Sequence, residues 1–307
     1  MAQEFPVATL PAPGVMAVDW EERVNFDRLR DYRLERTREQ MRAAGIGALL
    51  LFETSNIRYT TSTTIGYWAF NKSERWAVVT ATGQPKIWDF GSAARAHRLQ
   101  LPSLYHDHNS VAGNAGLQGA IGPRTELHKR AVAEIHDWLK EAGVENEPLG
   151  VDVAETAMFL ELLDAGLTVV DGQQVMMMAR EIKNQDEIML ITQATAMVDA
   201  VYQDILEALK PGVRESDIVA LAHHRLFELG SEFVEAINSI AGERCSPHPH
   251  VFSDRIIRPG DQAYFDIIHA FNGYRTCYYR TFGVGRATQP QRDAFRQSRE
   301  WMDAALA

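Results

Sequence analysis

A two-residue hairpin signal, Asn272-Gly273, separates one acidic residue, Asp266, from a cysteine, Cys277. If these two residues form the turn, Asp266 faces Tyr279 across the hairpin, and Cys277 is its diagonal neighbour on the same face. Asp266 and Cys277 would then lie close enough for one small ligand or ion to touch both. The alternative is that Asp266 accepts a local hydrogen bond and Cys277 is a small buried side chain.

Two histidines, His248 and His250, lie in a proline-containing loop just before the strand that carries Asp266. Histidine suits proton transfer near neutral pH, and its ring nitrogens also bind metals. We expect one of the two to face Asp266 as a general base or metal ligand and the other to face outward. The sequence alone does not say which one.

Arg280 follows on the returning strand, directly after Tyr279. Its guanidinium could bind a substrate carboxylate through two parallel hydrogen bonds, or it could pair within the sheet. We therefore predict a substrate-binding group of Cys277, Tyr279 and Arg280 beside the histidines. The sequence has no P-loop, GxGxxG or GxSxG motif, which excludes nucleotide-binding and α/β-hydrolase interpretations of this site.

Composition excludes several classes of partner. The net charge of −10 argues against a nucleic-acid partner, because binding a phosphate backbone needs a basic face. No stretch approaches the ~18 uninterrupted apolar residues of a membrane span, and the N-terminus lacks a secretory signal pattern. The two cysteines have no CxxC spacing and fit a reducing compartment, so we expect a cytoplasmic protein. A small molecule or short peptide is the expected substrate.

The chain of 307 residues is long enough for two domains. Residues 1–25 contain several prolines and predict an extended arm. Residues 26–175 alternate helices with short apolar strands, which predicts an α/β domain, and residues 176–307 predict an α+β domain. The expected helices span 26–44, 129–142, 156–165, 184–209, 216–229 and 289 onward, and the expected strands span 48–52, 76–80, 85–89, 169–170, 233–240, 262–268 and 275–283.

The order of five motifs resembles the creatinase, prolidase and aminopeptidase P superfamily. The motifs are REIKNQDEI from Arg180, KPGVRESD from Lys210, PHPH from Pro247, RPGDQAYFD from Arg258 and GYRTCYYRTF from Gly273. The first domain, with LLLFETSNIRYT from Leu49, is similar to the N-terminal α/β domain of that family. The resemblance covers about residues 28–300. It implies an α/β N-terminal domain followed by an α+β pita-bread catalytic domain, the latter incomplete.

The resemblance also implies a metal site that this sequence matches only in part. Family metallopeptidases hold two divalent ions, such as Mn, Co, Fe or Zn, with two aspartates, one histidine and two glutamates. The first aspartate matches Asp266, the second matches Cys277, and the other ligands belong to a later part of the domain. We therefore expect a C-terminally truncated chain with Asp266 as its metal ligand. Metal binding should be weakened, although a thiolate could still bind a softer metal.

Creatinase-like members imply a metal-independent alternative, in which a histidine of the matching loop activates water to cleave a C–N bond. We expect a homodimeric hydrolase of a small amino-acid derivative or an Xaa-Pro-type peptide, with His248 or His250 as the catalytic residue. Three other interpretations stay open: a non-catalytic pita-bread binding protein, a dimethylsulfoniopropionate lyase-like member and an ectoine hydrolase-like member.

Overall fold

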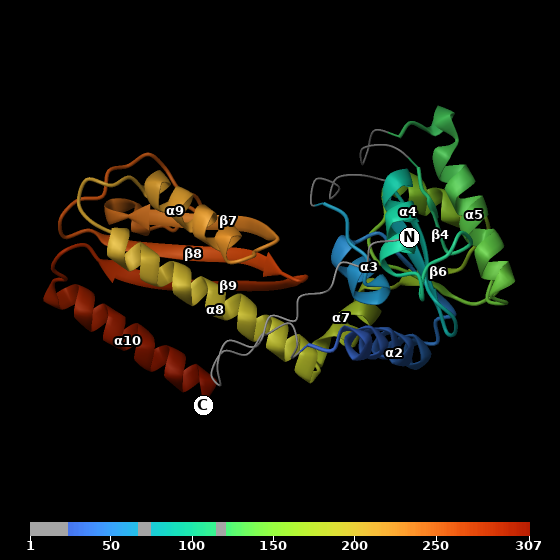
Figure 1. Cartoon of the computed structure of the whole chain (residues 1–307), viewed down its shortest axis with the longest axis horizontal. Helices are drawn as coiled ribbons and strands as arrows, with labels where there is room; N and C mark the ends of the chain where they lie inside the picture. Colours follow the sequence, from blue (N-terminus) through green and yellow to red (C-terminus); the bar gives the residue numbers. More distant parts are fainter. Residues whose placement is uncertain (1–23, 67–74, 115–120) are drawn as a thin grey trace, which may run out of the picture. The chain divides into compact units, whose positions relative to one another are not determined.

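The chain divides into two compact units, and the division falls between Asp186 and Glu187 (Figure 1). The computed structural model describes residues 24–66, 75–114 and 121–307. Nearly all of the predicted arm therefore lies outside the described residues. None of the helices in these described ranges is long and apolar enough to cross a membrane.

The boundary between the units lies later than the sequence predicted, which was after residue 175. The difference comes from helix α7 (Gln173–Glu181), which belongs to the first unit. Its side chains Val175, Met176 and Ala179 are buried in the core of that unit. Burial of apolar area therefore assigns α7 to the first unit.

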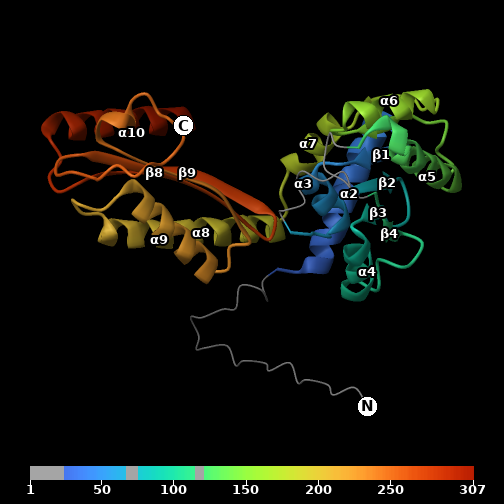
Figure 2. The ribbon, with the colours of Figure 1, turned by 90° about the horizontal axis from the view of Figure 1, so that it is seen from above.

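A six-stranded mixed sheet forms the centre of the first unit, in the order β4-β3-β2-β1-β5-β6. Figure 2 labels the four strands β1 to β4 of this sheet. The strands of the sheet are β1 (Ala48–Leu51), β2 (Trp76–Thr80), β3 (Lys86–Asp89), β4 (Ser110–Ala112), β5 (Leu149–Val151) and β6 (Val169–Asp171). The other elements are α2 (Phe26–Ala44), α3 (Thr54–Thr61), α4 (Gly91–Gln100), the 3-10 helix η2 (Pro123–Thr125), α5 (Leu127–Glu141) and α6 (Thr156–Asp164).

Strand β1 shows why a short continuous apolar run becomes a central strand. Leu49 and Leu51 join the core beside α2, α3 and α7, whereas Ala48 and Leu50 join the core beside α5 and α6. Successive side chains of a strand point to opposite faces, so a strand covered on both sides has no polar positions. The predicted strand at residues 48–52 is confirmed.

A buried ion cluster joins β3 to α4 in the first unit. The Asp89 carboxylate is fully buried, and its Oδ2 lies 2.9 Å from Arg75 Nε and 2.8 Å from His97 Nε2. The guanidinium of Arg75 also donates to the Thr63 carbonyl at 2.9 Å. Removing one partner of a buried pair leaves the other charge without compensation, which costs more than the pair contributes.

Replacement of Asp89 by Asn should lower the free energy of unfolding of the first unit by about 3–5 kcal/mol, because the buried Arg75 loses its counter-charge. Urea unfolding followed by fluorescence of the buried Trp76 and Trp88 measures the loss. The control is Asp303→Asn, which breaks an exposed pair with Arg299 and should change stability by less than about 0.5 kcal/mol. A similar small change in both variants would contradict the prediction.

The second unit is a three-stranded antiparallel sheet in the order β7-β8-β9. Its elements are α8 (Gln185–Ala208), α9 (Glu215–Glu228), β7 (Phe233–Ala241), the 3-10 helix η3 (Gly242–Cys245), β8 (Gln262–Phe271), β9 (Tyr274–Gly283) and α10 (Gln289–Leu306). Helices α8 and α9 cover one face of the sheet, and α10 lies on the other side (Figure 2). The core forms where Val201 and Ile205 of α8 and Leu226 of α9 meet Phe265 and Ile267 of β8.

His269 of β8 ties the sheet to α8 inside this core. The ring is fully buried, with Nε2 2.9 Å from the Ala194 carbonyl and Nδ1 3.0 Å from the Ser231 hydroxyl. A carbonyl oxygen only accepts, so Nε2 carries the proton and Nδ1 accepts from Ser231. Burial lowers the pKa of His269, which favours the neutral ring.

The buried neutral His269 predicts a pH dependence of stability. Its pKa is near 6.5 in the unfolded chain and lower in the folded chain, so the unfolded state binds more protons between the two values. Stability of the second unit should therefore be fully present above about pH 6.5 and fall as the pH drops below that value. Urea unfolding between pH 5 and 7.5 checks this, and His269→Gln should reduce the slope. An equal slope in wild type and variant would assign the effect to other groups.

Candidate active site on one face of the second sheet

The β8–β9 hairpin forms in the predicted register. Asp266 pairs with Tyr279, and Ile268 pairs with Cys277. Asn272 and Gly273 both have positive φ, 48° and 84°, as a two-residue hairpin turn of type I′ requires. The Cys277 thiol donates to Asp266 Oδ1 at 3.4 Å, so the predicted closeness of the two side chains is confirmed.

The Asp266 carboxylate is buried at the centre of the sheet face opposite α8 and α9, which we call the site face. Asp266 is 2% exposed, and Asn238 of β7 donates its side-chain amide to Asp266 Oδ2 at 3.1 Å. Tyr279 is the register partner of Asp266 across the hairpin, and burial together with the nearby Asp266 charge raises the pKa of its hydroxyl. The sequence analysis did not identify Asn238. A polar residue within the largely apolar β7 segment could have indicated it.

His248 reaches the site face between two tyrosines. Its Nε2 lies 3.1 Å from the Tyr279 hydroxyl, and its Nδ1 contacts the Tyr264 hydroxyl. Both tyrosine rings meet the imidazole edge-on, with centroid distances of 4.9 Å for Tyr264 and 5.7 Å for Tyr279. Burial raises the pKa of each of these tyrosines to about 12, so both hydroxyls keep their protons at neutral pH.

His250 does not face away from His248 as we expected. The two ring centroids lie 3.8 Å apart, because the backbone turns at His250, where φ is 47°. Burial and the neighbouring His250 ring lower the pKa of His248, while the negative charge of Asp266 opposes that shift. His248 is therefore neutral at pH 7 and able to accept a proton.

A buried glutamate anchors the loop that carries His248. Glu215, at the start of α9, accepts from the Ala241 amide at 2.9 Å and from the Ser253 amide at 2.9 Å. Arg244 pairs with the same carboxylate. The end of β7 and the middle of the loop are thus tied to one side chain that is fully buried. Sequence reasoning missed this role, because Glu215 looks like an ordinary first-turn acid of a helix.

Arg255 provides a second anchor for the same loop. Its guanidinium lies 2.7 Å from Glu243 and 2.7 Å from Asp261. Gly242 has φ of 65°, and a Cβ at this position would lie 2.2 Å from Arg255 Nη2. Only glycine therefore allows the guanidinium to pass this close to the backbone.

Arg280 lies on the other face of the sheet. Its Nη2 is 3.7 Å from Asp199 of α8, and its guanidinium carbon sits 4.6 Å from the centre of the Tyr278 ring. Alternation along β9 explains the position, because neighbours in a strand point to opposite faces. The structure thus brings together Asp266, Cys277, Tyr279 and His248 but not Arg280, whose substrate-binding role stays a prediction.

The described residues do not assemble the metal ligand set that the resemblance implies. In the described ranges, no three His, Cys, Asp or Glu side chains converge as a metal site. Burial and the hydrogen bond to Asp266 raise the pKa of Cys277 to about 11, so the thiol keeps its proton at neutral pH. Cys277 acts here as a hydrogen-bond donor to Asp266, and its side chain is exposed, not a buried apolar group.

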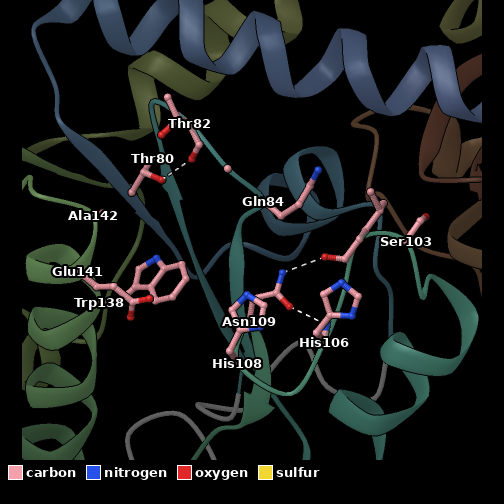
Figure 3. Close-up of a pocket in the computed structure, with 12 residues that line it drawn as sticks. Thr80, Thr82, Gln84, Ser103, His106, His108, Asn109, Trp138, Glu141 and Ala142 are labelled. Atoms are coloured by element: carbon pink, nitrogen blue, oxygen red, sulfur yellow. Dashed lines mark hydrogen bonds between the residues drawn. The ribbon is translucent and has the colours of Figure 1, made fainter.

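Another pair of histidines borders a hollow of about 290 Å³ in the first unit (Figure 3). The His106 and His108 rings stack 5.8 Å apart. Asn109 accepts from the His106 amide at 2.7 Å and donates to the Leu104 carbonyl at 2.9 Å, so its side chain holds the loop together. No third metal ligand joins the two rings within the described part of the chain. The sequence likewise showed no ligand spacing here.

Both units match models of known protein families. Residues 33–182 match the Creatinase/Prolidase N-terminal domain, and residues 189–307 match Metallopeptidase family M24. The fold predicted from the sequence, an α/β domain followed by a pita-bread domain, is confirmed.

Curated relatives differ in the activity that they carry. Dimethylsulfoniopropionate lyase DddP of Roseovarius nubinhibens is 26% identical over 87% of this chain and 60% of the relative. The probable dipeptidase PepE of Mycobacterium tuberculosis is 30% identical over 56% of this chain and 51% of the relative. The Xaa-Pro dipeptidase of Pyrococcus furiosus is 30% identical over 38% of this chain and 34% of the relative. The chain thus spans at most three fifths of the length of these relatives.

Solved structures show the same fold. An Xaa-Pro dipeptidase from Bacillus anthracis superposes with a TM-score of 0.68 at 20% identity, covering 86% of this chain and 68% of that one. A recombinant prolidase from Thermococcus sibiricus gives 0.68 at 20% identity, covering 90% and 71%. At this identity the likeness concerns the fold alone.

Replacement of His250 by Ala should raise the pKa of His248, because a like-charged neighbour and part of the cover over the ring are removed together. NMR titration of the His248 ring measures the shift. His224→Ala is the control, since His224 lies on α9 beside Glu228 and should leave His248 unchanged. An unchanged or lower pKa of His248 in the His250 variant would contradict the geometry.

Proposed function

The chain belongs to the creatinase/prolidase/aminopeptidase P superfamily, and we propose that it is a hydrolase that cleaves a C–N bond. The proposed substrate is a small amino-acid derivative or an Xaa-Pro-type peptide. Relatives named as dipeptidases support the reaction class. The observation that carries the proposal is His248, a neutral histidine held beside the buried carboxylate of Asp266 on the site face.

His248 is the proposed general base in this mechanism. A neutral imidazole takes a proton from water while the water oxygen attacks the substrate carbon, and it returns the proton to the leaving nitrogen. Asp266 stabilises the positive charge that develops on the ring during this step. Positioned proton transfer of this kind contributes about 10²- to 10⁴-fold to the rate.

The proposal does not rely on the two metal ions of family metallopeptidases. Cys277 replaces one carboxylate ligand by a protonated thiol, and Asp266 already accepts hydrogen bonds from Asn238 and Cys277. Metal analysis of the purified full-length protein tests this point. About two equivalents of Mn, Co, Fe or Zn that are needed for turnover would contradict metal-independent hydrolysis.

A lyase acting on dimethylsulfoniopropionate is the second candidate. The lyase relative aligns over more of this chain than the dipeptidases do, which favours this candidate. The same base would then remove a proton from carbon, its electron pair would form a C=C bond, and the neighbouring C–S bond would break to release dimethyl sulfide without consuming water. NMR of reaction mixtures with Xaa-Pro dipeptides, creatine, ectoine and dimethylsulfoniopropionate separates hydrolysis from elimination. Turnover of none of them would favour a non-catalytic binding protein.

The partners follow from the same proposal. We expect a homodimer on the basis of the family resemblance and a cytoplasmic location on the basis of the two unpaired cysteines, with a small molecule or short peptide as substrate. Analytical ultracentrifugation of the full-length protein measures the oligomeric state.

Replacement of His248 by Ala should abolish turnover of the active substrate and change the melting temperature little, because the ring lies at the surface of the site face. The matched variant His250→Ala removes the neighbouring ring and keeps the base, so it should retain turnover. Full activity of both variants would rule out a histidine of this loop as the base. Loss of activity only in the His250 variant would transfer the role to His250.

A further inference from the structure

We infer that Tyr264 and Tyr279 hold His248 as the Nε2–H tautomer, with Nδ1 as its basic nitrogen, and that Tyr264 also carries the proton between the attacking water and Nδ1. The inference rests on the proposed role of His248 as general base. It assigns a direction to the hydrogen bonds around the ring, from Tyr264 through His248 to Tyr279.

The loop backbone identifies the accepting nitrogen. The amide N–H of His250 points at His248 Nδ1 from 3.4 Å. An amide N–H only donates, so Nδ1 must accept, and a neutral imidazole has one donor and one acceptor nitrogen. The proton of the neutral ring therefore lies on Nε2. The Tyr264 hydroxyl, which also contacts Nδ1, must then donate to it.

Tyr279 supports the same assignment from the other side of the ring. Its hydroxyl oxygen lies 3.1 Å from His248 Nε2, where it can accept the ring proton. The donors that face Nδ1 and the acceptor that faces Nε2 thus agree on one tautomer. Partners of this kind on both ring nitrogens fix the tautomer and the orientation of a functional histidine.

The tautomer decides how His248 can take a proton. Its basic nitrogen faces the Tyr264 hydroxyl, so Tyr264 passes its own proton to Nδ1 as it receives one from the attacking water. The water oxygen keeps the electron pair that forms the new bond to carbon. The proton travels back the same way to the leaving nitrogen, and the site returns to its starting state. Tyr264 has 8% of its surface exposed, and its neighbour Tyr279 is more open at 41%.

The first arm of the test reads the tautomer directly and needs no substrate. NMR of the full-length protein labelled with ¹⁵N in histidine distinguishes a protonated from an unprotonated ring nitrogen. His248 signals are identified by their absence in His248→Gln. Above pH 7 we expect Nε2 protonated and Nδ1 unprotonated in the wild type, and a mixture of tautomers in Tyr279→Phe. A protonated Nδ1 in the wild type overturns the inference.

The second arm uses activity and a matched control. Tyr264→Phe should lower kcat on the order of 10²-fold with KM nearly unchanged, and it should keep the Nε2–H tautomer, since the His250 amide and Tyr279 remain. Tyr274→Phe loses a hydroxyl bonded to Glu187 on the same hairpin but away from His248, and it should change neither readout. Wild-type kcat in Tyr264→Phe would overturn the transfer role.

The two arms separate failure of this inference from failure of the proposed function. An Nε2–H tautomer with no turnover of any substrate contradicts the function and leaves the positioning intact. Loss of turnover in His248→Ala together with a protonated Nδ1 keeps the function and rejects the positioning.

Discussion

The Asn272-Gly273 turn sets the register of β8 and β9, and the contacts of the site face depend on that register. Both turn residues have positive φ, which fixes a two-residue connection and leaves no freedom in the pairing. A slip by one residue would move Asp266 to the face that α8 and α9 cover. It would then bury an uncompensated carboxylate in the apolar core. Turn geometry and the cost of burying a charge thus favour the same pairing.

The sheet of the second unit separates stability from chemistry by its two faces. One face packs Phe265 and Ile267 against α8 and α9, and the buried His269 joins the sheet to α8 there. The other face presents Asn238, Asp266 and the side chains around His248. Successive side chains of a strand point to opposite faces of the sheet, so the same strands supply both the core and the site. The same alternation places Arg280 beside α8, although it follows Tyr279 directly.

Long-range polar contacts bring the histidine loop to this face. The loop runs between β7 and β8 and has little regular structure beyond η3, so its backbone needs partners from elsewhere. Glu215 and Arg255 supply them, each by joining several points of the loop. Burial of these charged side chains is tolerated because each is paired and hydrogen-bonded. The site therefore depends on Glu215 at the start of α9, which holds the loop in place and lies far from His248 in the sequence.

The sequence by itself determined the elements, the two-domain order and the hairpin, because local patterns carry that information. The apolar run at β1, the helix ends at glycine and the Asn272-Gly273 turn each follow from backbone and burial rules that act over a few residues. Only the tertiary structure decided that Asn238 and Tyr264 belong to the site, that Arg280 does not lie on its face, and that α7 belongs to the first unit. These depend on strand pairing and packing between segments far apart in the chain. Short-range spacing does not contain such contacts. The direction of the hydrogen bonds around His248 is set only where the β7–β8 loop, β8 and β9 meet.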